Sequence, residues 1–115
     1  MKAAVLYGKE DIRVEERPRP AVGPGQMLVK ISYVGICGTD IEFYNLGQTP
    51  TPLPKILGHE NSGIVVEIGE GVEGFEVGDR VLCGPPTQCK DGCPSCKAGR
   101  PNICINGFPS TAGIG

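Results

Sequence analysis

Short runs of β-branched and aromatic residues recur along the chain, separated by glycine, proline and charged residues, and they predict several strands. Lys2 to Tyr7 and Ile12 to Glu16 predict two short strands around a polar turn. Met27 to Val34 alternates in part between apolar and polar positions, as a half-buried strand does. Asn61 to Ile68 and Phe75 to Leu82 predict an antiparallel hairpin across a glycine-rich turn.

One segment has a weak helical signature. Thr39 or Asp40 can cap a short helix, because both side chains can accept a hydrogen bond from a free backbone N–H. Ile41 and Tyr44 then share one face, and Gly47 is placed to end the helix. Many short strands, frequent turns and one weak helix predict a mainly all-β fold, as a barrel or a sandwich.

The segment from Gly69 to Gly74 matches the G-x-G-x-x-G pattern of dinucleotide-binding proteins. That pattern must open a helix whose first turn binds pyrophosphate, whereas here the chain continues into the strand predicted from Phe75 to Leu82. Glu70 and Glu73 would also repel phosphate. We therefore interpret these glycines as the turn of a hairpin.

The chain has 115 residues, 39% of them hydrophobic, which is enough for one domain with a core and too few for two ordinary domains. Its net charge of -2 leaves no basic surplus for phosphate, so nucleic acid is not an expected partner. There is no apolar run of membrane-spanning length and no signal-peptide pattern, so we expect a cytoplasmic protein without membrane contact. Six cysteines would suit a disulfide framework in a secreted chain, but cytoplasmic thiols stay reduced and available to metal.

Cys37 and His59, the only histidine, form a candidate metal pair that only the fold can bring together. A thiolate and an imidazole suit zinc, and an adjacent carboxylate suggests a site kept for chemistry. Asp40 is placed to accept a hydrogen bond from the ring nitrogen that faces away from the metal. Thr39 carries a hydroxyl that can give and take a proton, and Glu60 can bind the ion or stand beside it.

Each of these residues also has a purely structural interpretation. His59 can cap a strand, and Cys37 can pack as a small core residue. Thr39 and Asp40 can simply start a helix. The spacing alone leaves both the metal site and the structural interpretation open.

Four more thiols fall within one short loop that is rich in glycine, proline and charge and poor in residues that build a core: Cys89, Cys93, Cys96 and Cys104. Four thiolates suit tetrahedral zinc with no open position, and metal binding can order a lobe with little apolar surface. The spacing fits neither the bacterial iron–sulfur run nor a zinc ribbon. We therefore predict a structural zinc site in a lobe at about 84–106, with Cys83 packing separately at a strand end.

Three separated motifs occur in order: Gly35-Ile36-Cys37-Gly38-Thr39-Asp40, Gly58-His59-Glu60-Asn61-Ser62-Gly63 and Gly78-Asp79-Arg80-Val81. Through them, the chain from Met1 to about Cys104 resembles the zinc-containing alcohol dehydrogenases of the medium-chain dehydrogenase/reductase superfamily. The similarity looks greatest to polyol, butanediol and threonine dehydrogenases. It implies a GroES-like distorted β-barrel with short helical segments and a zinc-binding lobe.

The resemblance implies roles for the residues around His59. Cys37 and His59 would be ligands of a catalytic zinc, and Glu60 a nearby, sometimes exchanging, carboxylate. Asp40 would orient the histidine, and Thr39 would pass the proton of the substrate hydroxyl toward solvent. Zinc would polarise the hydroxyl of a small alcohol or polyol, whose carbon would give hydride to NAD or NADP.

The chain departs from the resembled pattern at three places. Relatives often have a histidine where this chain has Glu42, and some have an arginine against the cofactor pyrophosphate where it has Gly38. The first interval of the cysteine cluster holds three residues instead of the common two. Gly92 is expected to absorb the extra residue.

The resemblance also implies a nucleotide-binding domain and a further zinc ligand, neither of which these 115 residues contain. We therefore expect residues 1–115 to be one GroES-like catalytic domain that binds up to two zinc ions, is inactive alone and works within a homo-oligomeric enzyme. The alternative is a freestanding zinc-stabilised module that binds a protein partner without catalysis. Such a module has no need for the set of polar residues around His59, which favours the enzyme.

Overall fold

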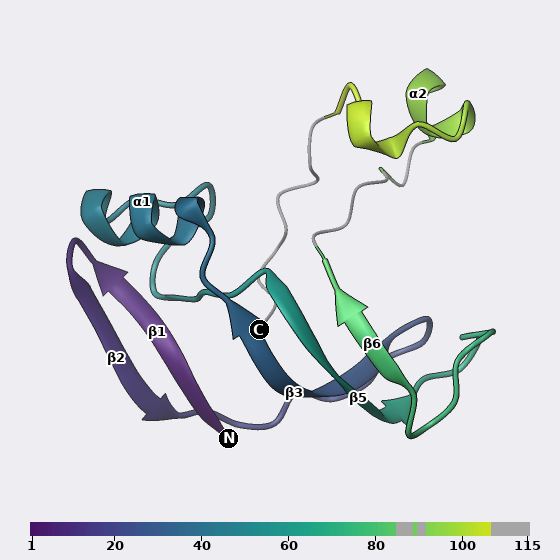
Figure 1. The fold of residues 1–115 in the computed structure, drawn as a ribbon, viewed down its shortest axis with the longest axis horizontal. Helices are drawn as coiled ribbons and strands as arrows, with labels where there is room; N and C mark the ends of the chain where they lie inside the picture. Colours follow the sequence, from purple (N-terminus) through teal and green to yellow (C-terminus); the bar gives the residue numbers. More distant parts are fainter. Residues whose placement is uncertain (85–88, 90–91, 107–115) are drawn as a thin grey trace.

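The computed structural model describes residues 1–84, 89 and 92–106, so part of the predicted lobe, residues 85–88, 90 and 91, lies outside the described residues. The described strands form two three-stranded sheets, ordered β2-β1-β4 and β3-β5-β6 (Figure 1). The strands are β1 (Lys2–Gly8), β2 (Asp11–Glu16), β3 (Met27–Gly35), β4 (Lys55–Ile56), β5 (Glu60–Ile68) and β6 (Arg80–Cys83). The helical elements are α1 (Gly38–Leu46), α2 (Pro94–Lys97) and the 3-10 helix η1 (Pro101–Ile103). The prediction of a mainly β fold is confirmed.

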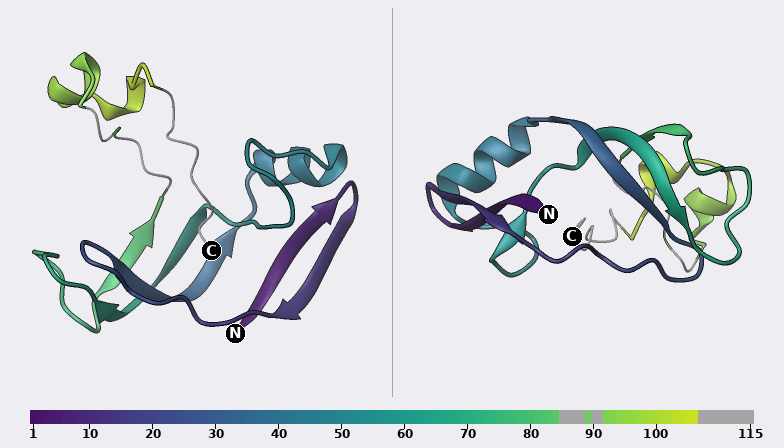
Figure 2. Two further views of the ribbon diagram at one scale, coloured as in Figure 1. Left: turned by 180° about the vertical axis from the view of Figure 1, so that it is seen from behind. Right: turned by 90° about the horizontal axis from the view of Figure 1, so that it is seen from below.

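The two sheets stay open where the sequence predicted a distorted barrel. A closed barrel needs every strand paired on both sides, but across the described strands no pairing joins one sheet to the other. β4 pairs with β1 over two residues, too few to carry the sheet further. Figures 1 and 2 show the sheets side by side, with α2 and η1 projecting beyond the end of β6. In the described ranges, no helix is long and apolar enough to cross a membrane.

Helix α1 lies over the tip of the β1–β2 hairpin (Figure 1). The backbone N–H of Glu10 donates to the carbonyl of Tyr44 at 2.8 Å, which ties the hairpin to the helix. Gly47 ends the helix as predicted, because its φ of 65° is left-handed and its N–H donates to the Phe43 carbonyl. A Cβ on Gly47 would lie 2.3 Å from the backbone nitrogen of Lys9, so only glycine allows this contact.

The start of α1 differs from the prediction that Thr39 or Asp40 caps it. Cys37 is the N-cap residue, in the extended conformation, and Asp40 is the third residue of the helix. Oδ2 of Asp40 accepts a hydrogen bond from the N–H of Cys37 at 2.9 Å. The carboxylate therefore satisfies a backbone donor at the helix start from inside the first turn, as in a capping box.

The β5–β6 hairpin is confirmed, but β6 begins at Arg80 instead of Phe75. Before it, the chain turns: Oδ2 of Asp79 accepts from the N–H of Glu76 at 2.9 Å, and Gly78 has a φ of 105°. The six-residue glycine motif lies in the connection between β5 and β6 and opens no helix. This supports its interpretation as a turn.

Gly63 lets β3 and β5 approach closely, since a Cβ there would lie 2.3 Å from the carbonyl oxygen of Lys30. We expect Gly63→Ala to lower the free energy of unfolding by about 1–3 kcal/mol, because the two backbones must separate. Urea denaturation measures the difference. Gly8→Ala is the control, since a Cβ at Gly8 meets nothing within 4 Å. A Gly63 variant as stable as the wild type would contradict the expectation.

Candidate metal centres

The pairing of β3 with β5 brings Cys37 and His59 together. Cys37 lies just after β3 and His59 just before β5, and Gly35 pairs with Glu60 between them. The Cys37 sulfur, a ring nitrogen of His59 and a carboxylate oxygen of Glu60 all lie within 4.8 Å of one another. Cys37 and His59 are half-buried, and Glu60 is exposed. This group is called the catalytic-site cluster below.

Asp40 touches both ends of this cluster. Its Oδ1 lies 3.6 Å from Nδ1 of His59, and its Oδ2 holds the N–H of Cys37. The residue is 8% exposed, and within the described part of the chain Oδ1 is buried without a hydrogen-bond partner. The carboxylate therefore fixes the backbone of one predicted ligand and faces the ring of the other. With Nδ1 turned to Asp40, Nε2 of His59 is the nitrogen available to a metal.

Thr39 lies in the first turn of α1 and is exposed. Among the described residues its hydroxyl has no hydrogen-bond partner, so it is free to give or accept a proton. Its part in proton transfer stays a prediction.

A cavity of about 340 Å³ adjoins the cluster, a volume within the range of small-molecule sites. Besides His59 and Glu60, its lining includes Tyr33, Asn61, Leu82 and Cys83. Sequence reasoning did not find Tyr33 and Leu82, which lie in one row of the sheet because both pair with Ser62. Strand alternation is the signal that could have placed them on one face, once the register was known.

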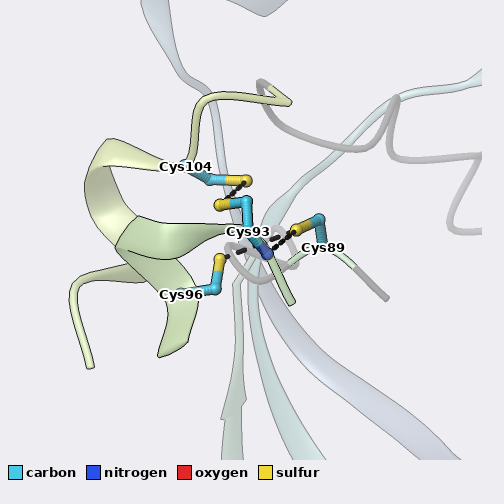
Figure 3. Close-up of side chains that lie close together, drawn as sticks. All are labelled: Cys89, Cys93, Cys96 and Cys104. Carbon is cyan, nitrogen blue, oxygen red and sulfur yellow. Dashed lines mark hydrogen bonds between the residues drawn. The ribbon is translucent and has the colours of Figure 1, made fainter. Parts of the chain in front are cut away.

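The four cysteines of the lobe turn their sulfur atoms toward one another (Figure 3), and all four lie within 4.8 Å of each other: Cys89, Cys93, Cys96 and Cys104. The sulfur of Cys89 lies 3.8 Å from that of Cys96, and the sulfur of Cys93 lies 3.8 Å from that of Cys104. Zn–S bonds of about 2.3 Å in a tetrahedron place sulfur atoms about 3.8 Å apart. The geometry of this four-cysteine cluster therefore fits zinc.

Local structure explains how the lobe gathers these thiols. Gly92 takes the left-handed conformation, with φ of 57°, directly before Cys93. Residues 90 and 91 of the first interval lie outside the described residues, so the expected role of Gly92 in accommodating the extra residue stays a prediction. Cys93 then caps α2 and donates its N–H to the sulfur of Cys89 at 3.4 Å, while Pro94 starts the helix and Cys96 follows within it. In the described part of the lobe, the cysteines themselves form the buried core.

Backbone donors favour the ionised thiol at two of the four cysteines, whereas at Cys96 burial and the neighbouring thiols outweigh the backbone donor and raise the pKa. The backbone N–H of Cys96 lowers the pKa of the Cys93 thiol to about 6. The backbone N–H of Cys93 lowers the pKa of Cys89 in the same way. Because zinc binds thiolates, a thiol that is already ionised need not release a proton on binding.

Zinc uptake is therefore expected to release fewer than four protons per ion near neutral pH. When the pH falls through about 6, Cys93 becomes protonated in the metal-free chain, and the release per zinc should rise by about one proton. An indicator dye in weak buffer, with one equivalent of zinc, measures the release at about pH 7.5 and about pH 5.5. Cys83→Ser should leave the difference intact, and a release equal at both pH values would contradict the expectation.

Residues 23–115 match the family model of the alcohol dehydrogenase GroES-like domain. The chain is 41% identical over 106 residues to a sorbitol dehydrogenase of Bombyx mori, covering 90% of this chain and 30% of that protein. The structure of 2R,3R-butanediol dehydrogenase from Bacillus subtilis matches with a TM-score of 0.80 and 37% identity, covering 99% of this chain and 35% of that one. A Sinorhizobium meliloti structure described as a zinc-binding dehydrogenase bound to NADP matches with a TM-score of 0.76 and 42% identity. The match covers 91% of this chain and 30% of that one. The chain thus spans about a third of the length of these relatives.

Proposed function

Because the chain belongs to the alcohol dehydrogenase GroES-like domain family, we propose that residues 1–115 are the zinc-binding catalytic domain of a nicotinamide-dependent alcohol or polyol dehydrogenase. The observation that carries the proposal is the meeting of Cys37, His59 and Glu60 within 4.8 Å beside a cavity of about 340 Å³. A module that only binds a protein partner has no use for this set. The names of the relatives support the class of substrate.

The donor set suits zinc, since it combines a thiol, an imidazole and a carboxylate. Bound there, zinc supplies Lewis acidity toward the oxygen of an alcohol. Cys37 and His59 would hold the ion, and the exposed Glu60 carboxylate is free to join them or withdraw. Asp40 keeps the His59 ring turned, and the Thr39 hydroxyl would take the proton of a bound alcohol and pass it outward.

The four-cysteine cluster would hold a second zinc with a structural role. Four thiolates complete a tetrahedron and leave no position for substrate. The lobe offers little other buried surface among its described residues, so the metal would supply most of its stability. Zinc binding by four thiolates needs reduced cysteines, and the cytoplasm, which we propose as the location, is a reducing compartment.

The hydride acceptor, NAD or NADP, would bind to a separate nucleotide-binding domain of a longer, homo-oligomeric polypeptide. Two observations support a separate nucleotide-binding domain: the relatives are about three times as long as the chain, and its G-x-G-x-x-G segment is a turn between strands. The Sinorhizobium meliloti structure contains NADP, which agrees with a nicotinamide acceptor.

Metal removal tests the proposal. The protein carrying this domain should oxidise a polyol such as sorbitol with NAD or NADP, followed by absorbance of the reduced cofactor. Dialysis against a chelator should lower the rate by about 100-fold or more, corresponding to about 3 kcal/mol of lost Lewis-acid assistance, and zinc should restore it. Activity that survives proven loss of zinc would contradict the proposal. Zinc binding without any alcohol oxidation would favour the binding module.

A further inference from the structure

The turn before His59 is held by a side chain outside the predicted ligand set. Asn61 is 5% exposed, and its Nδ2 donates to the carbonyl oxygen of Gly58 at 3.1 Å. Gly58 has a φ of 112°, and a Cβ there would lie 2.7 Å from Cγ1 of Val34. The turn therefore needs a glycine backbone, and the Asn61 amide holds that backbone in place.

This hydrogen bond acts on the peptide unit that leads directly into His59. The carbonyl of Gly58 and the N–H of His59 belong to one planar, rigid group. Fixing the carbonyl oxygen therefore fixes the direction in which the chain enters His59. Oδ1 of Asp40 lies 3.6 Å from Nδ1 of the ring, so Asp40 faces the side chain of His59 while the Asn61 amide fixes the backbone before it.

Packing alone does not explain an amide at this position. Asn61 lies in β5, the central strand, where it pairs with Val34 on one side and Cys83 on the other. Its Oδ1 is buried and has no hydrogen-bond partner within the ranges that the structure describes. Burying an unpaired carbonyl oxygen costs free energy that an apolar side chain would not lose.

We propose that Asn61 is a positioning residue for the catalytic-site cluster, because its amide fixes the Gly58–His59 peptide and thereby the place of the imidazole relative to Cys37. The inference rests on the proposed function, since it concerns the metal that His59 would bind. It adds a residue from β5 to the support that Asp40 gives from α1.

Cobalt(II) tests the inference, because its visible absorption reports the geometry of its ligands. The chain is first loaded with one equivalent of zinc to fill the four-cysteine cluster and is then titrated with cobalt. Asn61→Asp and Asn61→Leu both remove the N–H donor, the first with little change in size. Each should bind cobalt about 10-fold or more weakly and show displaced absorption bands at saturation.

Val65→Ala is the matched control, since Val65 lies in the same strand, is fully buried and belongs to neither cluster. It should lower the stability to urea and leave cobalt affinity and bands unchanged. If both Asn61 variants bind cobalt with the affinity and the absorption bands of the wild type, the inference is overturned while the proposed function stands. If the wild type binds no cobalt that His59→Ala removes, the proposed function fails together with it. If both Asn61 variants fail to fold while Val65→Ala folds, Asn61 serves the fold and the inference is also overturned.

Discussion

Cys96→Ser is expected to weaken zinc binding at the four-cysteine cluster by about 100-fold to 1,000-fold. The Cys96 sulfur is buried and lies 3.8 Å from that of Cys89, so the substitution removes one of four converging thiolates. Structural zinc contributes about 10–16 kcal/mol in small domains, or about 2.5–4 kcal/mol per thiolate, and about 1.4 kcal/mol corresponds to a tenfold change. Competition with a chromophoric chelator measures the affinity.

Cys83→Ser is the control for Cys96→Ser, because it makes the same chemical change at the one cysteine outside both clusters. It should bind zinc at the four-cysteine cluster as tightly as the wild type. Hydrogen exchange adds a structural reading: amides of residues 92–106 should lose protection in Cys96→Ser, since the thiols and their metal form the core of the lobe. Tight zinc in Cys96→Ser, or an equal loss in Cys83→Ser, would contradict the assignment.

His59→Ala is expected to abolish zinc binding at the catalytic-site cluster and to lower alcohol oxidation by the longer enzyme by about 1,000-fold or more. Without the imidazole, the cluster keeps one thiol and one exposed carboxylate, and about 4 kcal/mol or more of transition-state stabilisation is lost. Metal analysis by mass spectrometry should find one zinc per chain, held by the four cysteines. Steady-state kinetics measures the activity.

Glu42→Gln is the control for His59→Ala, since Glu42 is an exposed carboxylate of α1 outside the cluster. It should retain both zinc ions. Two zinc ions in His59→Ala would exclude this histidine as a ligand. Loss of the zinc held by the four-cysteine cluster would show that the substitution disturbs the whole fold.

Most strands were predictable because runs of β-branched and aromatic residues stand between glycine, proline and charged residues. The start of β6 was not, because Phe75 and Val77 favour strands while Gly78 and the Asp79 side chain impose a turn. The cap of α1 was missed because sulfur is a weak hydrogen-bond acceptor, and cysteine is therefore an unusual residue at that position. β4 is only two residues long and is a strand because it pairs with β1. The sequence around it has no local pattern that predicts a strand.

The two candidate sites differ in how far the sequence could reveal them. The cysteine cluster was predictable because short intervals alone bring its thiols together. Cys37 and His59 could be chosen only by residue type and resemblance, since their meeting depends on the β3–β5 register. Asn61 was overlooked within a run of strand residues, because its amide bonds to the carbonyl of Gly58 and this contact is visible only once the turn at Gly58 is known.

The ligands of the two sites also differ in how far apart they lie along the chain, and we therefore expect the two sites to form at different times during folding. The four cysteines are joined by short segments, so their lobe can close around zinc by local contacts. The site at His59 requires a long-range pairing of strands, which forms more slowly. Zinc bound at the cysteine lobe would therefore show only that the lobe is ordered, whereas zinc bound at Cys37 and His59 would show that the whole domain has folded.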